Sequence, residues 1–314
     1  MKSGNDTSSA DFFLLGFLSW TNVHMFSLAI IVLAFIAALS GNALLIFLIQ
    51  VDSSLHTPMY FFLSQLAFMD ICQTLIVVPK MVADFLTPGN PISPAGCGAQ
   101  VSLTLTMGRA ECLLLAVMAY DRYIAICNLL QYPILLSRRV CLGLTSSVWV
   151  GASADALILT TCAMHLPYCG SKEINYFFCE VPVLLKLSCS DTSQYETLLF
   201  VCGNFLLLIP SSTILASYSH ILAAVLSMKS TRGQQKALAT CSSHLTVVGM
   251  FYGAAIFTYM RPSSYHFPEQ VKIVSLFYTI VTPVLNPLIY SLRNKDFLAA
   301  LRNLFGKGRI FQQN

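Results

Sequence analysis

Charged side chains are scarce in this chain. Only 10% of its 314 residues are Asp, Glu, Lys or Arg, whereas 56% are hydrophobic, and the mean hydropathy is +0.69. Soluble domains of this size carry about 25% charged residues. The composition therefore excludes a soluble globular protein and indicates a membrane protein.

Motifs of common membrane enzymes and transporters are also missing. The chain has no His-Glu-x-x-His, no Gly-x-Ser-x-Gly, no glycine-rich phosphate loop and no paired Cys-x-x-Cys. Inverted repeats, broken helix pairs and polar stripes along several helices, which would indicate a transporter or channel, are absent from the sequence as well. An enzyme is therefore not expected, and a seven-helix transporter is only a distant alternative.

Long apolar segments are abundant. A helix needs about 20 apolar residues to cross the hydrocarbon core, and lipid requires every backbone polar group to be bonded internally. The segments that qualify are 25–50, 58–86, 98–122, 140–164, 197–228, 237–260 and 270–292. We predict an all-α membrane protein with an N-terminal segment over 1–24, one seven-transmembrane helix bundle over 25–292 and a tail over 293–314.

Lys and Arg residues predict the orientation of the bundle. With residue 1 outside, eleven of them lie on the cytoplasmic side and six on the outer side, as the positive-inside rule requires. The triplet Asn5-Asp6-Thr7 agrees, because Asn5 is then a possible glycan acceptor in the lumen. The net charge of +4 indicates a rim facing anionic lipid and no nucleic-acid partner.

Residues 293–309 combine apolar side chains with basic ones, which predicts a short amphipathic helix on the inner leaflet.

Four cysteines fall in the predicted exterior, where oxidation is allowed. They are Cys97, Cys169, Cys179 and Cys189. Four cysteines permit three pairings, and their spacing alone leaves all three open.

An acid and a guanidinium stand side by side where the third apolar segment ends, in the run Met118–Cys127. Charge near lipid is costly and is usually paired or functional. Asp121 and Arg122 therefore form either a static packing contact or a switch.

Three further motifs accompany this pair: LHTPMYFFLS at 55–64, KALATCSSHL at 236–245 and PVLNPLIY at 283–290. Together the four motifs closely resemble those of the vertebrate olfactory receptors, a branch of the rhodopsin-like G-protein-coupled receptors. The resemblance extends from Gly41 to Lys295. The chain departs from it at Leu129 and Gln131, where the family usually has proline and a basic residue or histidine.

The resemblance implies an odorant receptor in the plasma membrane of olfactory cilia, with its N-terminus outside. A small volatile ligand would activate a Gs/Golf-type G protein and raise cyclic AMP; a receptor for another small non-amine ligand outside the nose is the alternative. The resemblance also implies the disulfides Cys97–Cys179 and Cys169–Cys189. Arg122, held by Asp121 at rest, would be released to meet the G protein. The residues implied in coupling are Asp121, Arg122, Tyr123, Tyr218, His244, Asn286, Pro287 and Tyr290.

Polar residues also occur deep in the predicted bundle. Lone acids in lipid are expensive, so we expect them to converge. By resemblance, Asn42, Asp70, Glu111 and Asn286 form a sodium or proton site under the ligand pocket. Protonated acids satisfied by neighbouring hydroxyls are the alternative, and no other cofactor is expected.

On the third segment, a face at helical spacing is formed by Thr104, Leu105, Gly108, Arg109 and Cys112. By resemblance they line a small, mostly apolar ligand pocket, although plain helix packing explains each of them equally well. The remaining lining is expected from Cys202, Gly203, Leu206, Tyr252, Ile256, Tyr259, Leu276 and Thr279. A biogenic-amine receptor would have an acid at Thr104 and an opsin a lysine at Ile280, so neither an amine nor retinal is expected.

Arg109 needs a partner inside the membrane. Glu111 lies about 200° away around the helix, because successive residues are about 100° apart. Asp155 in the fourth segment is expected at a similar depth. Two hypotheses remain open: Arg109 pairs with Asp155 beside the pocket, or it contacts a carbonyl or acid of the ligand.

Overall fold

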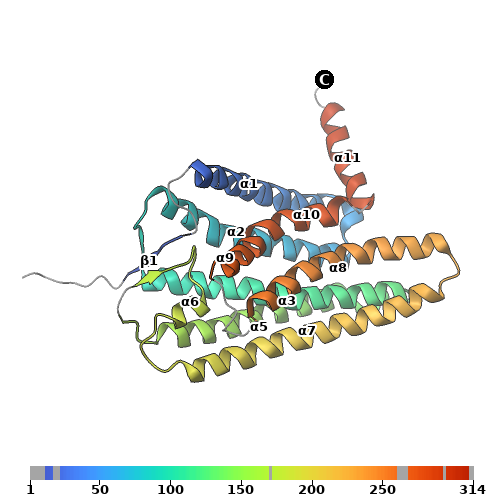
Figure 1. Ribbon diagram of the computed structural model, residues 1–314. Coiled ribbons are helices and arrows are strands. Elements are labelled where there is room, and N and C mark those ends of the chain that lie inside the picture. Colours follow the sequence, from blue (N-terminus) through green and yellow to red (C-terminus); the bar gives the residue numbers. More distant parts are fainter. Residues whose placement is uncertain (1–10, 17–21, 170–171, 260–267, 293–294, 311–314) are drawn as a thin grey trace, which may run out of the picture.

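The computed structural model describes residues 11–16, 22–169, 172–259, 268–292 and 295–310. Within these residues, seven helical stretches are long and apolar enough to cross a membrane, which confirms the predicted bundle. They lie side by side in Figure 1. In chain order they are α1 (Asn22–Val51), α2 (Pro58–Leu86), α3 (Pro94–Cys127), α5 (Arg138–Met164), α7 (Ser193–Ser227), α8 (Thr231–Tyr259) and a seventh helix made of α9 (Pro268–Leu276), η3 (Phe277–Val281) and α10 (Thr282–Leu292).

Shorter elements connect the spans. They are η1 (Ser53–Leu55), α4 (Tyr132–Leu135) and α6 (Val181–Leu185), and α11 (Lys295–Ile310) follows the seventh span. Phe297 and Ala300 of α11 are buried, Leu301 and Leu304 pack against the bundle, and Arg302 is exposed. The predicted amphipathic character of this helix is confirmed, and the apolar face is turned toward the other helices.

The third helix is longer than its apolar window. It begins at Pro94, where the Ser93 hydroxyl accepts a hydrogen bond of 3.1 Å from the Gly96 N–H, and it continues to Cys127. Backbone hydrogen bonds extend a helix whether or not its residues are apolar. Asp121 and Arg122, predicted at the end of the apolar segment, therefore lie inside a helix that continues to Cys127.

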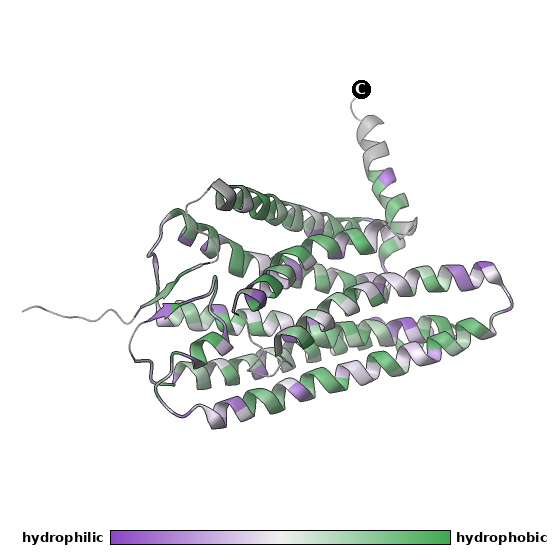
Figure 2. Ribbon diagram, in the orientation of Figure 1, coloured by the Kyte–Doolittle hydropathy of each residue, from purple (hydrophilic) through white to green (hydrophobic). Residues whose placement is uncertain are grey.

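The bundle is arranged around α3, the most buried of the seven spans, while α7 is the least buried. Large apolar side chains such as Phe200, Phe205 and Leu208 of α7 are exposed. Figure 2 shows hydrophobic residues along the outer helices. An apolar outer surface suits contact with lipid tails, which are as apolar as the side chains that face them.

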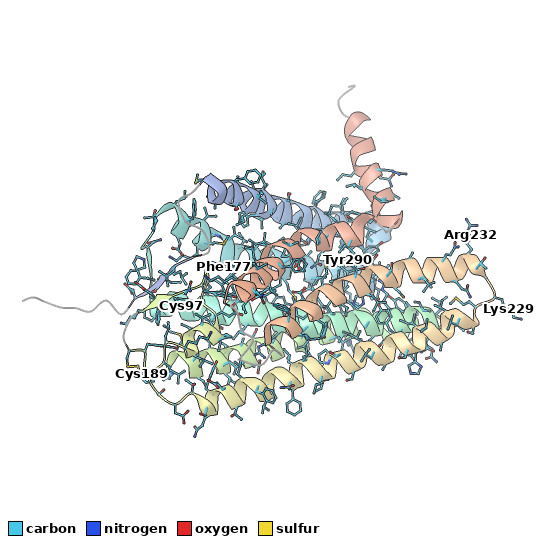
Figure 3. All side chains as sticks on the ribbon, viewed as in Figure 1. Cys97, Phe177, Cys189, Lys229, Arg232 and Tyr290 are labelled. Atoms are coloured by element: carbon cyan, nitrogen blue, oxygen red, sulfur yellow. A yellow bond between two sulfur atoms is a disulfide. The ribbon has the colours of Figure 1, made fainter. Side chains whose placement is uncertain are left out.

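A small sheet closes one end of the bundle. Strand β1 (Phe12–Leu14) lies between β2 (Pro91–Ile92), to which it is antiparallel, and β3 (Glu173–Ile174), to which it is parallel. The disulfides Cys97–Cys179 and Cys169–Cys189 lie at this end, with Cα–Cα distances of 5.5 and 5.8 Å, and both predicted pairings are confirmed. Cys97 and Cys189 are labelled in Figure 3, at the end opposite to Lys229 and Arg232.

The seventh helix has an irregular middle. Residues Phe277–Val281 form a π-helical turn between α9 and α10. Such turns widen the helix locally and are frequent at functional sites. The sequence did not predict this turn, which lies between the outer part of the helix and the Asn286-Pro287 motif.

Candidate functional site

The Asp121–Arg122 pair is tied to the loop between α3 and α5. Arg122 Nε lies 3.8 Å from Asp121 Oδ2, and the Tyr132 hydroxyl donates a 2.8 Å hydrogen bond to Asp121 Oδ1. Burial, followed by the neighbouring Asp121 carboxylate, raises the pKa of Tyr132, so the phenol keeps its proton and remains a donor. Asp121 is 1% exposed. The carboxylate is therefore held both by the arginine and by the loop.

Tyr132 is not predicted from the sequence, because no periodicity connects it to Asp121 across the loop. It is the first residue of α4, a turn that forms although Leu129 and Gln131 depart from the family pattern. Leu129 and Leu130 are 69% and 95% exposed. The altered residues thus leave the tyrosine contact in place.

Two other coupling residues meet beside this pair. The Tyr218 hydroxyl lies 2.7 Å from His244 Nδ1, and their rings are stacked. The Tyr123 ring packs against His220 of α7. The Tyr290 hydroxyl is buried and has no hydrogen-bond partner among the described residues. Its place in the bundle is labelled in Figure 3.

The predicted polar cluster in the middle of the bundle does assemble. Asn286 donates from Nδ2 to both oxygens of Asp70, at 3.2 and 3.0 Å, and both residues are 2% exposed. Asn42 donates a 2.8 Å hydrogen bond to the carbonyl of Pro283. Gly41 allows this approach of α1 to the seventh helix, because an added Cβ would lie 3.3 Å from Pro287 Cγ.

Glu111 completes this cluster. It lies close enough to Asp70 to interact with it electrostatically. Three buried oxygens, Asn42 Oδ1, Glu111 Oε1 and Asn286 Oδ1, have no hydrogen-bond donor among the described residues. A buried site rich in acceptors and poor in donors fits a hard cation or an added proton. A group of three or more His, Cys, Asp or Glu residues suited to a metal does not occur in the described ranges.

The predicted ligand-lining residues lie on α3, α7, α8 and the seventh helix. Thr104, Leu105 and Gly108 are half-buried, and a Cβ added at Gly108 would meet no atom within 4 Å. Cys202 and Gly203 are half-buried too. Leu206 packs against the buried cluster that contains Cys112 and Tyr252. Leu276 packs against the buried cluster that contains Phe177 and Phe178, and Thr279 is fully buried. Ile256 is 48% exposed, and the side chain of Tyr259 lies outside the described residues, as does Asn5.

The hydroxyl groups of Thr104, Thr279 and Tyr252, which are the described ones in this lining, are already engaged. Thr104 donates to the carbonyl of Gln100 at 2.8 Å, and Thr279 donates to that of Ser275 at 2.6 Å. The Tyr252 hydroxyl lies 3.2 Å from Cys112 Sγ. A ligand would therefore find an apolar wall whose hydroxyl protons are largely occupied.

Arg109 forms an ion pair with Asp155 through Nη1 and Oδ2, so the predicted intramembrane pair is confirmed. The arginine is 7% exposed, and the side chain of Asp155 is 25% exposed. The Cys202 side chain of α7 lies near the Asp155 carboxylate. The pair thus joins α3 and α5 beside α7, next to Gly108.

The loop after α5 is fastened over the end of the bundle that carries the two disulfides. Gln100 accepts a 2.8 Å hydrogen bond from the backbone N–H of Cys179, and Lys272 Nζ donates to Asn175 at 2.8 Å. Phe177 and Phe178 are 1% exposed. Gln100 and Lys272 were not predicted as site residues, since a single polar residue near a helix end carries no pattern that identifies its partner.

Filling the space beside Gly108 should shift the receptor's preference toward smaller ligands without harming the fold. We expect Gly108→Val to lower the potency of the largest agonists by tenfold or more and to spare the smallest, because the added atoms occupy open space. Dose–response curves for a series of increasing ligand length test this. Surface staining serves as the control, and equal losses for all ligand sizes would contradict the account.

Comparison with known proteins agrees with this architecture. A family model described as olfactory receptor matches residues 31–307. Human Olfactory receptor 2T11 is 53% identical over 300 residues, covering 96% of this chain and 95% of the relative. Mouse Olfactory receptor 2V1 is 52% identical over 310 residues, covering 99% and 98%. With seven membrane-spanning helices and matches over nearly its full length, the chain is a multi-pass membrane receptor and not an enzyme, and it belongs to the olfactory receptor family.

Proposed function

We propose that this chain binds a small, mostly apolar volatile molecule inside the helix bundle and activates a Gs/Golf-type G protein, which raises cyclic AMP. The observation that carries the coupling part is the Asp121–Arg122 pair, held by Tyr132 at one end of the bundle. A charge pair of this kind is weak enough to break and costly enough to bias two states. The contacts around it are those expected of a resting receptor.

In this proposal the N-terminus is extracellular. The two disulfides and β1 share the end opposite to Lys229 and Arg232 (Figure 3). Disulfides persist in oxidising compartments, and basic residues favour the cytoplasmic side. Both rules support the same orientation. The plasma membrane of olfactory cilia is the location that we propose.

On activation, Arg122 would leave Asp121 and meet the C-terminal helix of the Gα subunit. Tyr218 would leave His244, and Tyr290, whose hydroxyl has no partner among the described residues, would turn toward Arg122. Asn42, Asp70, Glu111 and Asn286 would hold a sodium ion or a proton in the resting state. Their unsatisfied oxygens support this role.

Loss of the loop contact should raise basal signalling. We expect Tyr132→Phe to increase cyclic AMP without ligand by several-fold, because a hydrogen bond to a carboxylate contributes about 1.5–3 kcal/mol and part of it is lost on activation. Tyr120→Phe is the matched control, since Tyr120 precedes Asp121 on α3 and is 39% exposed. Unchanged basal cyclic AMP in Tyr132→Phe would remove Tyr132 from the resting restraint.

The choice of G protein is tested by supplying Gα subunits one at a time. Cells lacking endogenous Gs-type subunits would receive the receptor with either a Gs-type or a Gi-type α subunit and be screened with volatiles. We expect cyclic AMP to rise only with the Gs-type subunit. A response that needs another subunit would contradict the proposed coupling but leave the ligand site unaffected.

A further inference from the structure

Arg109 is the one strongly polar side chain in the predicted lining, and its hydrogen-bonding capacity is only partly used. Its Nη1 pairs with Asp155, whereas Nε is buried and has no hydrogen-bond acceptor among the described residues. A guanidinium has five N–H donors, and buried donors are rarely left without an acceptor. A ligand atom is a natural candidate for the missing acceptor.

The structure is open at the residue that precedes the arginine. Gly108 precedes it on α3, and a Cβ added there would meet no atom within 4 Å. Thr104 and Leu105 lie one turn earlier on the same face and are half-buried. The open space is therefore at Gly108, the residue next to Arg109 along α3, and the half-buried Thr104 and Leu105 share that part of the helix.

The other hydroxyl groups of the lining that the structure describes do not compete for this role. The Thr104 and Thr279 hydroxyls donate to carbonyls of their own helices, and the Tyr252 hydroxyl lies against Cys112. A ligand oxygen that needs a donor consequently finds Arg109 first. An apolar molecule without oxygen would leave Nε without an acceptor.

Charge balance narrows the ligand class further. Arg109 and Asp155 already neutralise each other. A carboxylate ligand would bring a second anion close to Asp155 in a medium of low dielectric constant, where repulsion between like charges is strong. A cationic amine would approach Arg109 and be repelled for the same reason.

We infer that Arg109 recognises a neutral hydrogen-bond acceptor on the ligand, typically the carbonyl oxygen of an aliphatic ketone, while Asp155 holds the guanidinium in position. This inference rests on the proposed function in so far as the ligand enters the bundle. It goes beyond it by assigning the ligand class and the recognising atom, Arg109 Nε. The apolar wall would then bind the hydrocarbon chain.

The test measures binding directly, so that it does not depend on coupling. Purified full-length receptor in lipid nanodiscs is heated with straight-chain methyl ketones, with alkanes of matched length or with matched carboxylates, and the shift of the unfolding midpoint is followed with concentration. We expect ketones of suitable length to stabilise the receptor at concentrations at least about tenfold lower than the matched alkanes and carboxylates, as a hydrogen bond from a charged donor implies.

Two variants separate recognition from stability. Arg109→Met/Asp155→Leu removes both charges, and Arg109→Asp/Asp155→Arg moves the guanidinium to α5 while keeping the pair. Both avoid an unpaired buried charge. We expect each to reach the cell surface and to lose the preference for ketones. Lys80→Met/Asp84→Leu removes another ion pair, 2.5 Å long, at the outer part of α2, and should keep the preference.

The outcomes are distinct. Ketone preference in the wild type that disappears in both Arg109 variants supports the inference. Binding of alkanes or carboxylates ahead of ketones, absence of ketone binding at every chain length, or a ketone preference that survives in a folded Arg109 variant would overturn it. Ketone binding without a cyclic AMP response would instead refute the proposed coupling and leave the ligand class intact.

Discussion

Replacement of Cys97 by serine is expected to reduce receptor at the cell surface by an order of magnitude or more. The Cys97–Cys179 bond closes a sequence separation of 82 residues and fixes the loop after α5 to the top of α3. Loss of a native disulfide costs about 2–5 kcal/mol, a large part of the 5–15 kcal/mol typical of protein stability. Flow cytometry of an N-terminal epitope measures the effect.

The matched control for this experiment is Cys162→Ser. Cys162 is a free, exposed cysteine on α5, so its loss should leave surface staining close to that of the wild type. Cys97→Ser that reaches the surface as well as Cys162→Ser would show that the bond does not hold the outer end of the bundle.

Breaking the Asp70–Asn286 contact should reduce signalling about as strongly as loss of the disulfide reduces the surface level. Asn286→Leu leaves a 2% exposed carboxyl group without its two hydrogen bonds, and an unsatisfied buried group of this kind costs about 1–3 kcal/mol or more. We expect the ligand response to fall by more than tenfold. The exchanged variant Asp70→Asn/Asn286→Asp restores a carboxyl-to-amide contact and should recover a large part of it.

The exchange is decisive because each of its two component changes, Asp70→Asn and Asn286→Asp, alters one half of the same contact. Recovery beyond the sum of the single effects indicates direct interaction, as in a double-mutant cycle. An exchanged receptor that signals no better than Asn286→Leu, at equal surface level, would mean that Asp70 and Asn286 act separately.

The spans were predictable because lipid imposes length and apolarity on each of them. The bounds of the helices were less predictable. Helix α3 extends beyond its apolar window at both ends, because Ser93 and Pro94 set its start and backbone hydrogen bonds continue past Arg122. The strand at Phe12–Leu14 was not predicted, because its partners β2 and β3 lie far along the chain. Nor was the π-helical turn at Phe277–Val281.

The site shows the same division. The Arg109–Asp155 pair followed from depth along two helices and from the cost of a lone charge in lipid, and the structure contains it. The contact between Tyr132 and Asp121 crosses a loop whose path depends on tertiary packing, so it could not be predicted from spacing. Engagement of the Thr104 hydroxyl by its own helix was missed for a different reason: serine and threonine bond locally in ways that composition does not reveal.

The central claim, a ligand-driven receptor whose output passes through Arg122, is tested most directly by one comparison. Cyclic AMP is measured in cells that express this chain with a Gs-type α subunit and a trafficking chaperone, during exposure to a panel of volatiles, for the wild type and for Arg122→Ala. We predict a dose-dependent rise in the wild type that is lost in Arg122→Ala at equal surface staining. A response that persists in Arg122→Ala would contradict the account.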